Sequence, residues 1–598
     1  MKSRIIIAAA GCIALCTQAQ TTSKTQADNG DQTRLKKEIT VDRSIVPQLR
    51  EAKRLNMSPI VELPTTTATK LDYSPRTVTA RVPALFTTLN PAAYGDSIAT
   101  DHTRGYLTLG YGPTFDAMAS GGFQLIDTKG TKLGAWLQYD GYMFHDNVYY
   151  GTRNLSSTSE QKALFRNNNF KGGLSLSQAT GKNSVLDIDL VYGFGKVNCP
   201  DLHTDLLNSY YDPNDPRFVL ETNRHHINRF DGKAALKGST ASLVYSIGAK
   251  YEIFAFGNTG SSRKSDKENI FGVEASIQSN PENESQGLVS VSYTSMHDTH
   301  TPWEYREGED KSYTQGLATI MPTYRYKSEQ FTADLGLRLD ISHNSGKTVH
   351  VAPNIKLAWL PTEQVTVWAK AGGGEVQNTL ASIYSFTPYI TPLDSYGNSN
   401  VPVTIDGGIT VGPFSGAYVK LYGGWAKAKN WLVPGSYSWL CDGYSMDMID
   451  ISGYHAGITA GYSYRRLAEI EVSAEIAPQG EDKGYYLWRD RAKQVISATL
   501  TVHPLEQLDV NAGWELRSGR ITNEKYGVDP GFDIDRISNW LTADYPTLSN
   551  VSLGARWRFN RNVSAFADVQ NLLNHKNVTY IGEGARGIHG MIGVALKF

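Results

Sequence analysis

The chain closes on GIHGMIGVALKF, residues 587–598, in which apolar and non-apolar side chains alternate up to a terminal phenylalanine. Successive side chains of an extended strand point to opposite faces, so one face of this segment is apolar. The apolar row is Ile588, Ile592, Val594, Leu596 and Phe598. Because chain ends fray unless they are held, a strand that ends on an aromatic residue predicts a paired edge. The edge strand of a soluble sandwich and the closing strand of a barrel both fit this pattern.

Composition narrows the classes of protein. The chain has 598 residues, a formal net charge of -1 and 40% hydrophobic residues. A charge near zero gives no basic footprint for nucleic acid, and we expect no nucleic-acid partner. Beyond the N-terminus, no apolar run reaches the ~18 residues that a membrane helix requires. Any membrane role must therefore come from a barrel or from peripheral attachment.

The first residues, MKSRIIIAAAGCIALCTQAQ, have the layout of a secretory signal peptide: basic residues, an apolar stretch, then small residues. We assign residues 1–20 to this signal, since a lipoprotein signal ending at Cys12 would be too short. Residues 21–101 are polar and rich in Thr, Lys and Pro, so we expect an extended periplasmic segment. The mature chain keeps Cys199 and Cys441, and a disulfide or two free thiols both suit an exported protein.

From residue 102 onward, strand-like alternation recurs. FTADLGLRLDI (331–341), AEIEVSAEI (468–476) and QLDVNAGWELR (507–517) each alternate apolar and polar side chains. They run to about ten residues, which matches a tilted crossing of a bilayer better than the ~5–6 residues of soluble strands. Their polar rows are the lumen-lining candidates: Asp334, Arg338, Asp340, Glu469, Glu471, Glu475, Asp509, Asn511, Glu515 and Arg517. Such a row can be a water-facing wall whose ion pairs hold the barrel, or a surface that binds a substrate or partner by charge.

Turn lengths give an independent signal. Nine short links, such as 180–183 and 559–562, alternate with long irregular stretches, such as 145–166, 199–228 and 429–453. Outer-membrane barrels sort their connections in this way, with short turns in the periplasm. We therefore predict an all-β fold: a transmembrane antiparallel β-barrel of about 22 strands over residues 102–598, with short periplasmic turns and long extracellular loops. Six tryptophans, Trp136, Trp359, Trp368, Trp425, Trp514 and Trp557, are candidates for the aromatic girdles.

Metal and catalytic motifs are weak. The stretch SMHDTH carries His297, Asp298 and His300 on a predicted loop, and His225 and His226 lie on another. Solvated side chains explain both better than a metal site does. Two acidic groups lack the spacing of a calcium loop; they are Asp212, Asn214 and Asp215, and Asp529, Asp533 and Asp535. No nucleophile elbow, phosphate loop or zinc spacing occurs, so we expect no metal, no cofactor and no enzymatic activity.

The C-terminal region resembles the last hairpin of TonB-dependent outer-membrane receptors. The positions that carry the resemblance are Phe566, Asn571, Leu572, Leu573, Asn574 and Tyr580, followed by a final strand that ends in Phe. The resemblance implies a 22-stranded barrel, and the leader is similar in composition to exported proteins of the Bacteroides group. In KEITV, residues Glu38, Ile39, Thr40 and Val41 are similar to a TonB box. The chain departs from the family where a plug domain is expected, because only about 80 residues precede the barrel.

Two functions follow from this resemblance. The first is an integral outer-membrane barrel that binds a nutrient or transports it across the outer membrane, in contact with TonB. The second is a non-transporting barrel that serves as a scaffold subunit of an outer-membrane complex, with other outer-membrane or periplasmic proteins as partners. A bare barrel of this size leaks, so the leader, infolded loops or another protein must fill it. By resemblance, Phe598, Leu596 and Val594 form the signal that the barrel-assembly machinery reads.

Overall fold

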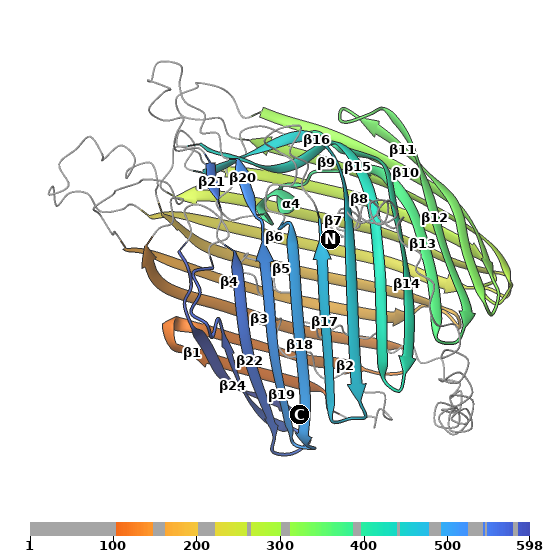
Figure 1. The fold of residues 1–598 in the computed structure, drawn as a ribbon. Helices are drawn as coiled ribbons and strands as arrows, with labels where there is room; N and C mark the ends of the chain where they lie inside the picture. The colour runs from red at the N-terminus through yellow and green to blue at the C-terminus, as the bar shows by residue number, and fades with distance from the viewer. Residues whose placement is uncertain are drawn as a thin grey trace, which may run out of the picture.

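The strands of this protein close into a single antiparallel barrel of 22 strands (Figure 1). The computed structural model describes residues 103–147, 162–200, 222–259, 265–300, 311–386, 396–438, 443–477, 492–523, 542–544, 547–577 and 584–598. Neighbours along the chain pair in order from β1 to β19, then β22, β23 and β24, and β24 pairs with β1. Strands β20 and β21 form a separate two-stranded sheet. The prediction of an antiparallel barrel of about 22 strands is confirmed.

The elements have the following bounds: β1 Gly105–Gly112, η3 Pro113–Phe115, β2 Asp116–Asp127, β3 Thr131–Asn147, β4 Lys162–Ala179, β5 Ser184–Pro200, β6 Thr222–Ser239, β7 Leu243–Thr259, β8 Ser265–Ser279, β9 Ser285–His300, β10 Lys311–Lys327, β11 Phe331–His343, β12 Val349–Thr362, β13 Val365–Val376, α4 Leu380–Tyr384, β14 Ser399–Phe414, β15 Ala417–Ser438, β16 Gly443–Tyr464, β17 Ala468–Ile476, β18 Gln494–Leu505, β19 Leu508–Ser518, β20 Ile521–Asn523, β21 Thr542–Asp544, β22 Leu548–Arg558, β23 Val563–Gln570 and β24 His589–Lys597.

The seam between β24 and β1 holds the chain end. Leu596 pairs with Leu107 and Val594 with Leu109. The carbonyl oxygen of Phe598 accepts hydrogen bonds from the backbone N–H groups of Arg104 and Gly105, both at 2.7 Å. The last strand is therefore paired at its edge, as the alternating C-terminal segment predicted.

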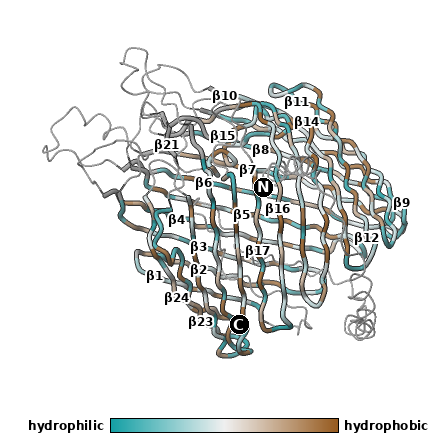
Figure 2. Tube along the Cα trace, viewed as in Figure 1, coloured by the Kyte–Doolittle hydropathy of each residue, from teal (hydrophilic) through white to brown (hydrophobic). Residues whose placement is uncertain are grey.

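Alternation sorts the side chains into two faces. On β11, Leu335, Leu337 and Ile341 are exposed on the outer face, while Asp334 and Asp340 are buried on the inner face. On β24, Ile592 is 71% exposed and belongs to the same outer row as Val594. Figure 2 shows hydrophobic and hydrophilic residues alternating along the strands throughout the barrel. An apolar belt on the outside suits a lipid environment.

The two rims differ as predicted. One rim carries only short links, for example between β4 and β5 and between β22 and β23. The other rim carries the long connections, but the strands extend further into them than the sequence indicated. Residues 429–453, predicted as a long loop, belong mostly to β15 and β16, and the predicted loops at 145–166 and 199–228 also lose residues to strands. Paired polar strands that rise above the apolar belt lack the hydrophobic row that identifies a strand in sequence.

The barrel wall is uneven in height. Strands β15 and β16 have 22 residues each, whereas β1 and β23 have 8 and β24 has 9. Since the short turns align one rim, the extra length projects from the other. The wall therefore stands tall at β15 and β16 and low from β17 through the seam to β2.

The predicted girdle tryptophans divide between the faces. Trp359, Trp425, Trp514 and Trp557 belong to outward rows by the pairing register, and Trp359 and Trp557 are exposed there. The prediction is wrong for the other two tryptophans. Trp136 and Trp368 belong to inward rows, where their rings lie across Gly173 and Gly408 of the neighbouring strands.

The described residues include one α-helix, α4, which the sequence did not predict. In the part of the chain that the structure describes, no helix is long and apolar enough to cross a membrane. Several predictions fall outside the described residues: the signal peptide, the segment 21–101 with its TonB-box-like residues, the acidic groups at 212–215 and 529–535, and the positions Cys441 and Tyr580.

Candidate functional site: the lumen wall and its inner strap

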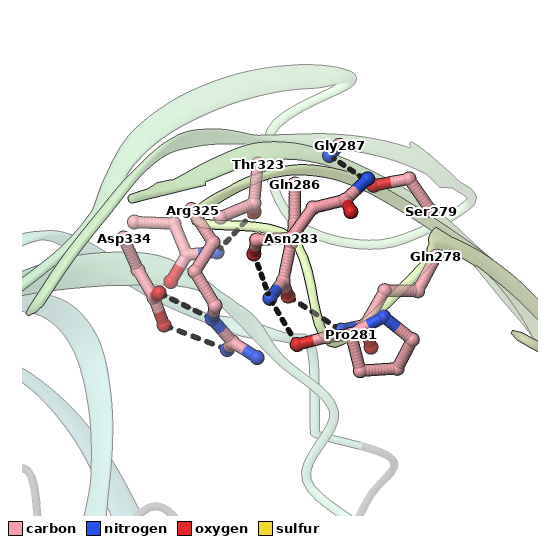
Figure 3. A network of polar contacts seen from close by, with 10 residues as sticks. Gln278, Ser279, Pro281, Asn283, Gln286, Gly287, Thr323, Arg325 and Asp334 are labelled. Atoms are coloured by element: carbon pink, nitrogen blue, oxygen red, sulfur yellow. Dashed lines mark hydrogen bonds and ion pairs between the residues drawn. The ribbon is translucent and has the colours of Figure 1, made fainter. Parts of the chain in front are cut away.

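All ten lumen-lining candidates lie on inward rows of the barrel, and one of them, Asp334, belongs to a rim-side network on β8 to β11. The guanidinium of Arg325 on β10 donates two hydrogen bonds to Asp334 on β11, at 2.6 and 2.9 Å. Beside them, Gln286 donates to the carbonyl oxygens of Pro281 and Asn283 and so folds the short β8–β9 turn against the wall (Figure 3). Asp334 therefore serves to join two strands at the short-turn rim.

Asp340 on β11 is the centre of a second network, further up the wall. Its side chain is fully buried, at 0% exposure. It accepts hydrogen bonds from the Thr319 hydroxyl at 2.5 Å, the Arg338 guanidinium at 2.9 Å and the backbone N–H of Glu375 at 2.7 Å. Arg338 also donates to the carbonyl oxygen of Glu375 at 2.9 Å. Three donors around one buried carboxylate fix β10, β11 and β13 relative to one another.

The glutamates of β17 form an inward column. The Tyr418 hydroxyl donates to Glu471, and the Tyr422 hydroxyl donates to Glu475 at 3.3 Å. Buried His455 on β16 lies between two carboxylates, with Nδ1 3.6 Å from Glu475 and Nε2 3.7 Å from Asp406 of β14. Glu469 lies nearer the rim, opposite Thr501. This part of the wall combines aromatic hydroxyls with carboxylates.

The polar row of β19 is paired across and along strands. Asp509 accepts from Arg558 Nη2 and from His503 Nδ1, each at 2.7 Å. Arg517 pairs with Glu515 on its own strand. Asn511 lies inward, opposite Thr501 of β18. Most of the predicted charges on β11 and β19 thus have partners in the wall itself.

A connection between β13 and β14 turns into the lumen. Residues 377–386, which we name the inner strap, include Asn378, the N-cap Thr379 and helix α4. Within α4, Leu380, Ile383 and Tyr384 are buried, at 2%, 1% and 6% exposure. A five-residue helix has no stability of its own, so contacts with the wall must hold it.

The tip of the inner strap contacts β7 and β8. The backbone N–H of Leu380 donates to Glu268 Oε2 at 2.8 Å. The ring of Tyr384 stacks on Phe256 with 4.1 Å between centroids and lies 5.5 Å from Phe254. Its hydroxyl contacts Asp266 at 3.4 Å. All four wall residues belong to inward rows by the strand register, so the strap lies inside the barrel.

The base of the strap is held at β11 to β14. Asn378 Nδ2 donates to the carbonyl oxygen of Gly397 at 2.6 Å and to the Ser399 hydroxyl at 3.0 Å. The backbone N–H of Asn398 donates to Ser345 at 2.6 Å. Asn400 donates to Glu375 at 2.6 Å, which links the base to the Asp340 network.

The weak metal candidates do not come together in the structure. His297 and Asp298 lie on β9 rather than on a loop, and neighbours on a strand face opposite ways. His297 hydrogen-bonds Thr314 on the outer face, whereas Asp298 is buried inward opposite Glu268. His225 and His226 are likewise neighbours on β6, not loop residues. Among the described residues, no group of three or more His, Cys, Asp and Glu is placed to hold a metal.

A second connection folds onto the low part of the wall. Arg586, between β23 and β24, pairs with Asp116 of β2 and lies over the ring of Tyr142, 4.8 Å from its centroid. The backbone N–H of Ala585 donates to Asp146 at 2.7 Å. Burial lowers the pKa of Arg586 to about 10, so the guanidinium stays charged at neutral pH and the contact is an ion pair.

Sequence patterns did not identify Glu268, Asp266 or Tyr384. Each belongs to a stretch without apolar alternation of its own, and their meeting depends on a connection that crosses the lumen. The N-cap Thr379, three residues before Ser382 whose N–H it accepts at 3.0 Å, was the available local sign of a helix start.

The fold is similar to that of solved outer-membrane receptors. A ferric enterobactin receptor (PfeA) mutant from Pseudomonas aeruginosa is 12% identical, with a TM-score of 0.62 over 83% of this chain and 80% of that chain. The siderophore receptor PirA from Acinetobacter baumannii is 11% identical, with a TM-score of 0.63 over 83% and 80%. The ferripyoverdine receptor of Pseudomonas aeruginosa, bound to ferripyoverdine, is 11% identical, with a TM-score of 0.58 over 83% and 72%.

At such low identity the likeness establishes the fold: this chain has the 22-stranded barrel of outer-membrane siderophore receptors. No family model matches the sequence. No curated protein matches it either.

Proposed function

We propose that this protein is a receptor-like barrel of the outer membrane that binds a nutrient outside the cell and admits it across that membrane. The observation that carries the proposal is the closed barrel itself, apolar outside and polar inside, with a connection turned into its lumen. Such a wall suits a solute path lined by water. The solved barrels of this fold named above are receptors rather than enzymes, and they support a binding or uptake role.

The names of those neighbours suggest a first ligand class to test, an iron–siderophore complex. Cells lacking the gene should lose growth on one iron source or one other scarce nutrient, and the intact gene should restore it. Uptake of the labelled nutrient should fall in parallel. Unchanged growth and uptake on every source tested would count against a transport role.

Coupling to TonB is tested at the N-terminal segment. Replacing Ile39 with Pro, within the TonB-box-like residues Glu38, Ile39, Thr40 and Val41, should abolish uptake but leave binding at the cell surface, because Pro cannot donate the backbone hydrogen bond of an added strand. Replacing Thr65 with Pro, in the same segment but away from KEITV, is the matched control. Uptake at the natural level in both variants would show that this barrel does not depend on TonB.

Affinity purification from membranes distinguishes the scaffold alternative. Stoichiometric recovery of partners other than TonB, with no nutrient phenotype, would identify the barrel as a subunit of an outer-membrane complex. Replacing Arg338 and Arg517 together should weaken the binding of a partner that docks by charge on the lumen wall. Since both arginines already pair with carboxylates of the wall, unchanged recovery would assign them to holding the barrel.

A further inference from the structure

The inner strap crosses the lumen from one part of the wall to another. It leaves β13 and its tip contacts β8 and β7, which lie five and six strands away around the ring of 22. At ~4.8 Å between neighbouring strands, the path along the wall would be about 24 Å or more. The strap therefore joins two parts of the inner wall that lie well apart around the ring.

The strap lies toward the rim with the long connections. Phe254 and Phe256 belong to the last third of β7, Leu243–Thr259, which starts at a short turn. Glu268 is near the start of β8, Ser265–Ser279, and the short turn follows the end of that strand. A solute entering from that rim meets the strap before it reaches the lower part of the inner wall.

Contacts at both ends hold the strap in one place. At the tip, three apolar side chains of α4 are buried and Glu268, itself 1% exposed, accepts the Leu380 N–H. At the base, Asn378 bridges Gly397 and Ser399. Lifting the tip would expose Leu380, Ile383 and Tyr384 to water and would leave Glu268 without its backbone donor, and both changes are unfavourable.

We infer that the inner strap is a fixed constriction that sets the largest solute able to enter the barrel from outside. This inference rests on the proposed function in one respect, namely that solutes use the lumen. The residues that determine the limit are Leu380, Ile383 and Tyr384, because they hold the strap across the lumen. Glu268 and Phe256 are the positioning residues on the wall.

The test compares solute size limits of purified full-length protein in liposomes. The release variant carries Leu380→Ser, Ile383→Ser and Tyr384→Ala, and Tyr384→Ala alone is the milder version. Tyr245→Ala is the matched control: its ring lies over Gly238 on the outer face of β7, the strand that also carries Phe256. Heat-modifiable migration in gels shows which variants have a folded barrel.

Swelling in sugars of increasing size, from arabinose to stachyose, gives the limit. The release variant should admit sugars that the natural chain excludes, with several-fold faster swelling in the largest, and Tyr245→Ala should not differ from the natural chain. The same limit in the natural chain, the release variant and Tyr245→Ala, including no entry into any of them, would overturn the inference.

A cross-linked form separates a fixed constriction from a moving lid. Tyr384→Cys and Phe256→Cys, with Cys199 and Cys441 replaced by Ser, are joined by a short bismaleimide. Before cross-linking this form lacks the stack of Tyr384 on Phe256 and should admit larger sugars, as Tyr384→Ala does, and cross-linking should restore the limit of the natural chain. Loss of entry of sugars that the natural chain admits would show a strap that must move and would contradict the inference. Swelling needs no natural ligand, so a shifted limit without a nutrient phenotype would refute the proposed function alone.

Discussion

Glycines at the seam allow side chains to cross between strands. A Cβ on Gly105 would lie 2.6 Å from the Phe598 ring, which also stacks on Phe123 at 6.3 Å between centroids. Gly593 on β24 has the same role further along, where the ring of Phe566 and the carbonyl oxygen of Leu109 occupy the space of a Cβ. These glycines are required by close approach rather than by turns.

Gly593→Val should therefore hinder closure of the barrel. Overpacking costs about 1–3 kcal/mol when side chains can shift, and a backbone oxygen cannot shift without disturbing the seam. We expect a smaller heat-modifiable fraction and a lower urea midpoint. Gly287→Val on β9 is the control, because a Cβ at Gly287 would meet no atom within 4 Å. An equal loss of folded barrel in both variants would show that a larger side chain costs no more at the seam than at Gly287.

Asp340→Ala should destabilise the wall by about 3–5 kcal/mol, because it leaves Arg338 charged and partly buried without its partner. Removing both, as Asp340→Ala with Arg338→Met, should recover part of the loss. Glu469→Ala, on an exposed position of the same inner face, should change stability by no more than about 0.5 kcal/mol. Urea unfolding in detergent measures the stability of all three variants. Equal losses of stability for Asp340→Ala and Glu469→Ala would show that the buried network contributes no more than an exposed residue of the inner face.

At the residue scale, the sequence identified those side chains whose face of the barrel wall is determined by alternation alone. Asp334, Asp340 and Glu515 could be assigned to the inner face because each stands in a regular row. The cross-strand partners of Asp334 and Asp340 could not be assigned, since Arg325 and Thr319 reach them through a register that one strand does not reveal. Trp136 and Trp368 were misplaced for a related reason, because aromatic residues suit either face of a barrel wall.

At the element scale, short turns and the apolar centres of strands were predictable. The inner strap was not, because α4 has only five residues and its apolar side chains face a wall formed by distant strands. The upper parts of β15 and β16 were also missed, since both faces there carry mixed residues.

Asn378→Ala should loosen the base of the strap. The variant removes donors to Gly397 and Ser399, a loss of about 1–3 kcal/mol, which corresponds to roughly 5- to 150-fold in a local opening equilibrium. Hydrogen exchange of the amides in 379–386 should accelerate accordingly. Asn354→Ala, which removes a hydrogen bond to Thr323 on the wall, is the control; protection unchanged in the first variant would mean that the tip alone holds the strap.

At the scale of the whole molecule, closure depends on the last residue. Deleting Phe598 removes the acceptor for the Arg104 and Gly105 N–H groups and the ring that stacks on Phe123. Surface-assembled protein should fall several-fold by protease accessibility and heat-modifiable migration, with total synthesis unchanged. Phe559→Ala removes an exposed aromatic from a short turn and should assemble normally. Normal assembly of the Phe598 deletion would contradict the proposal that Phe598 belongs to a signal for the assembly machinery.

The seam delays closure of the barrel until its last strand has been synthesised. Strands β1 and β24 stand at opposite ends of the barrel sequence, yet they must pair to close the ring. At about 5–20 residues per second of synthesis, roughly 25 to 100 seconds separate the appearance of the first strand from that of the last. During this interval the apolar row of every completed strand exists before the barrel has closed. The ring can therefore close only after β24 has been synthesised.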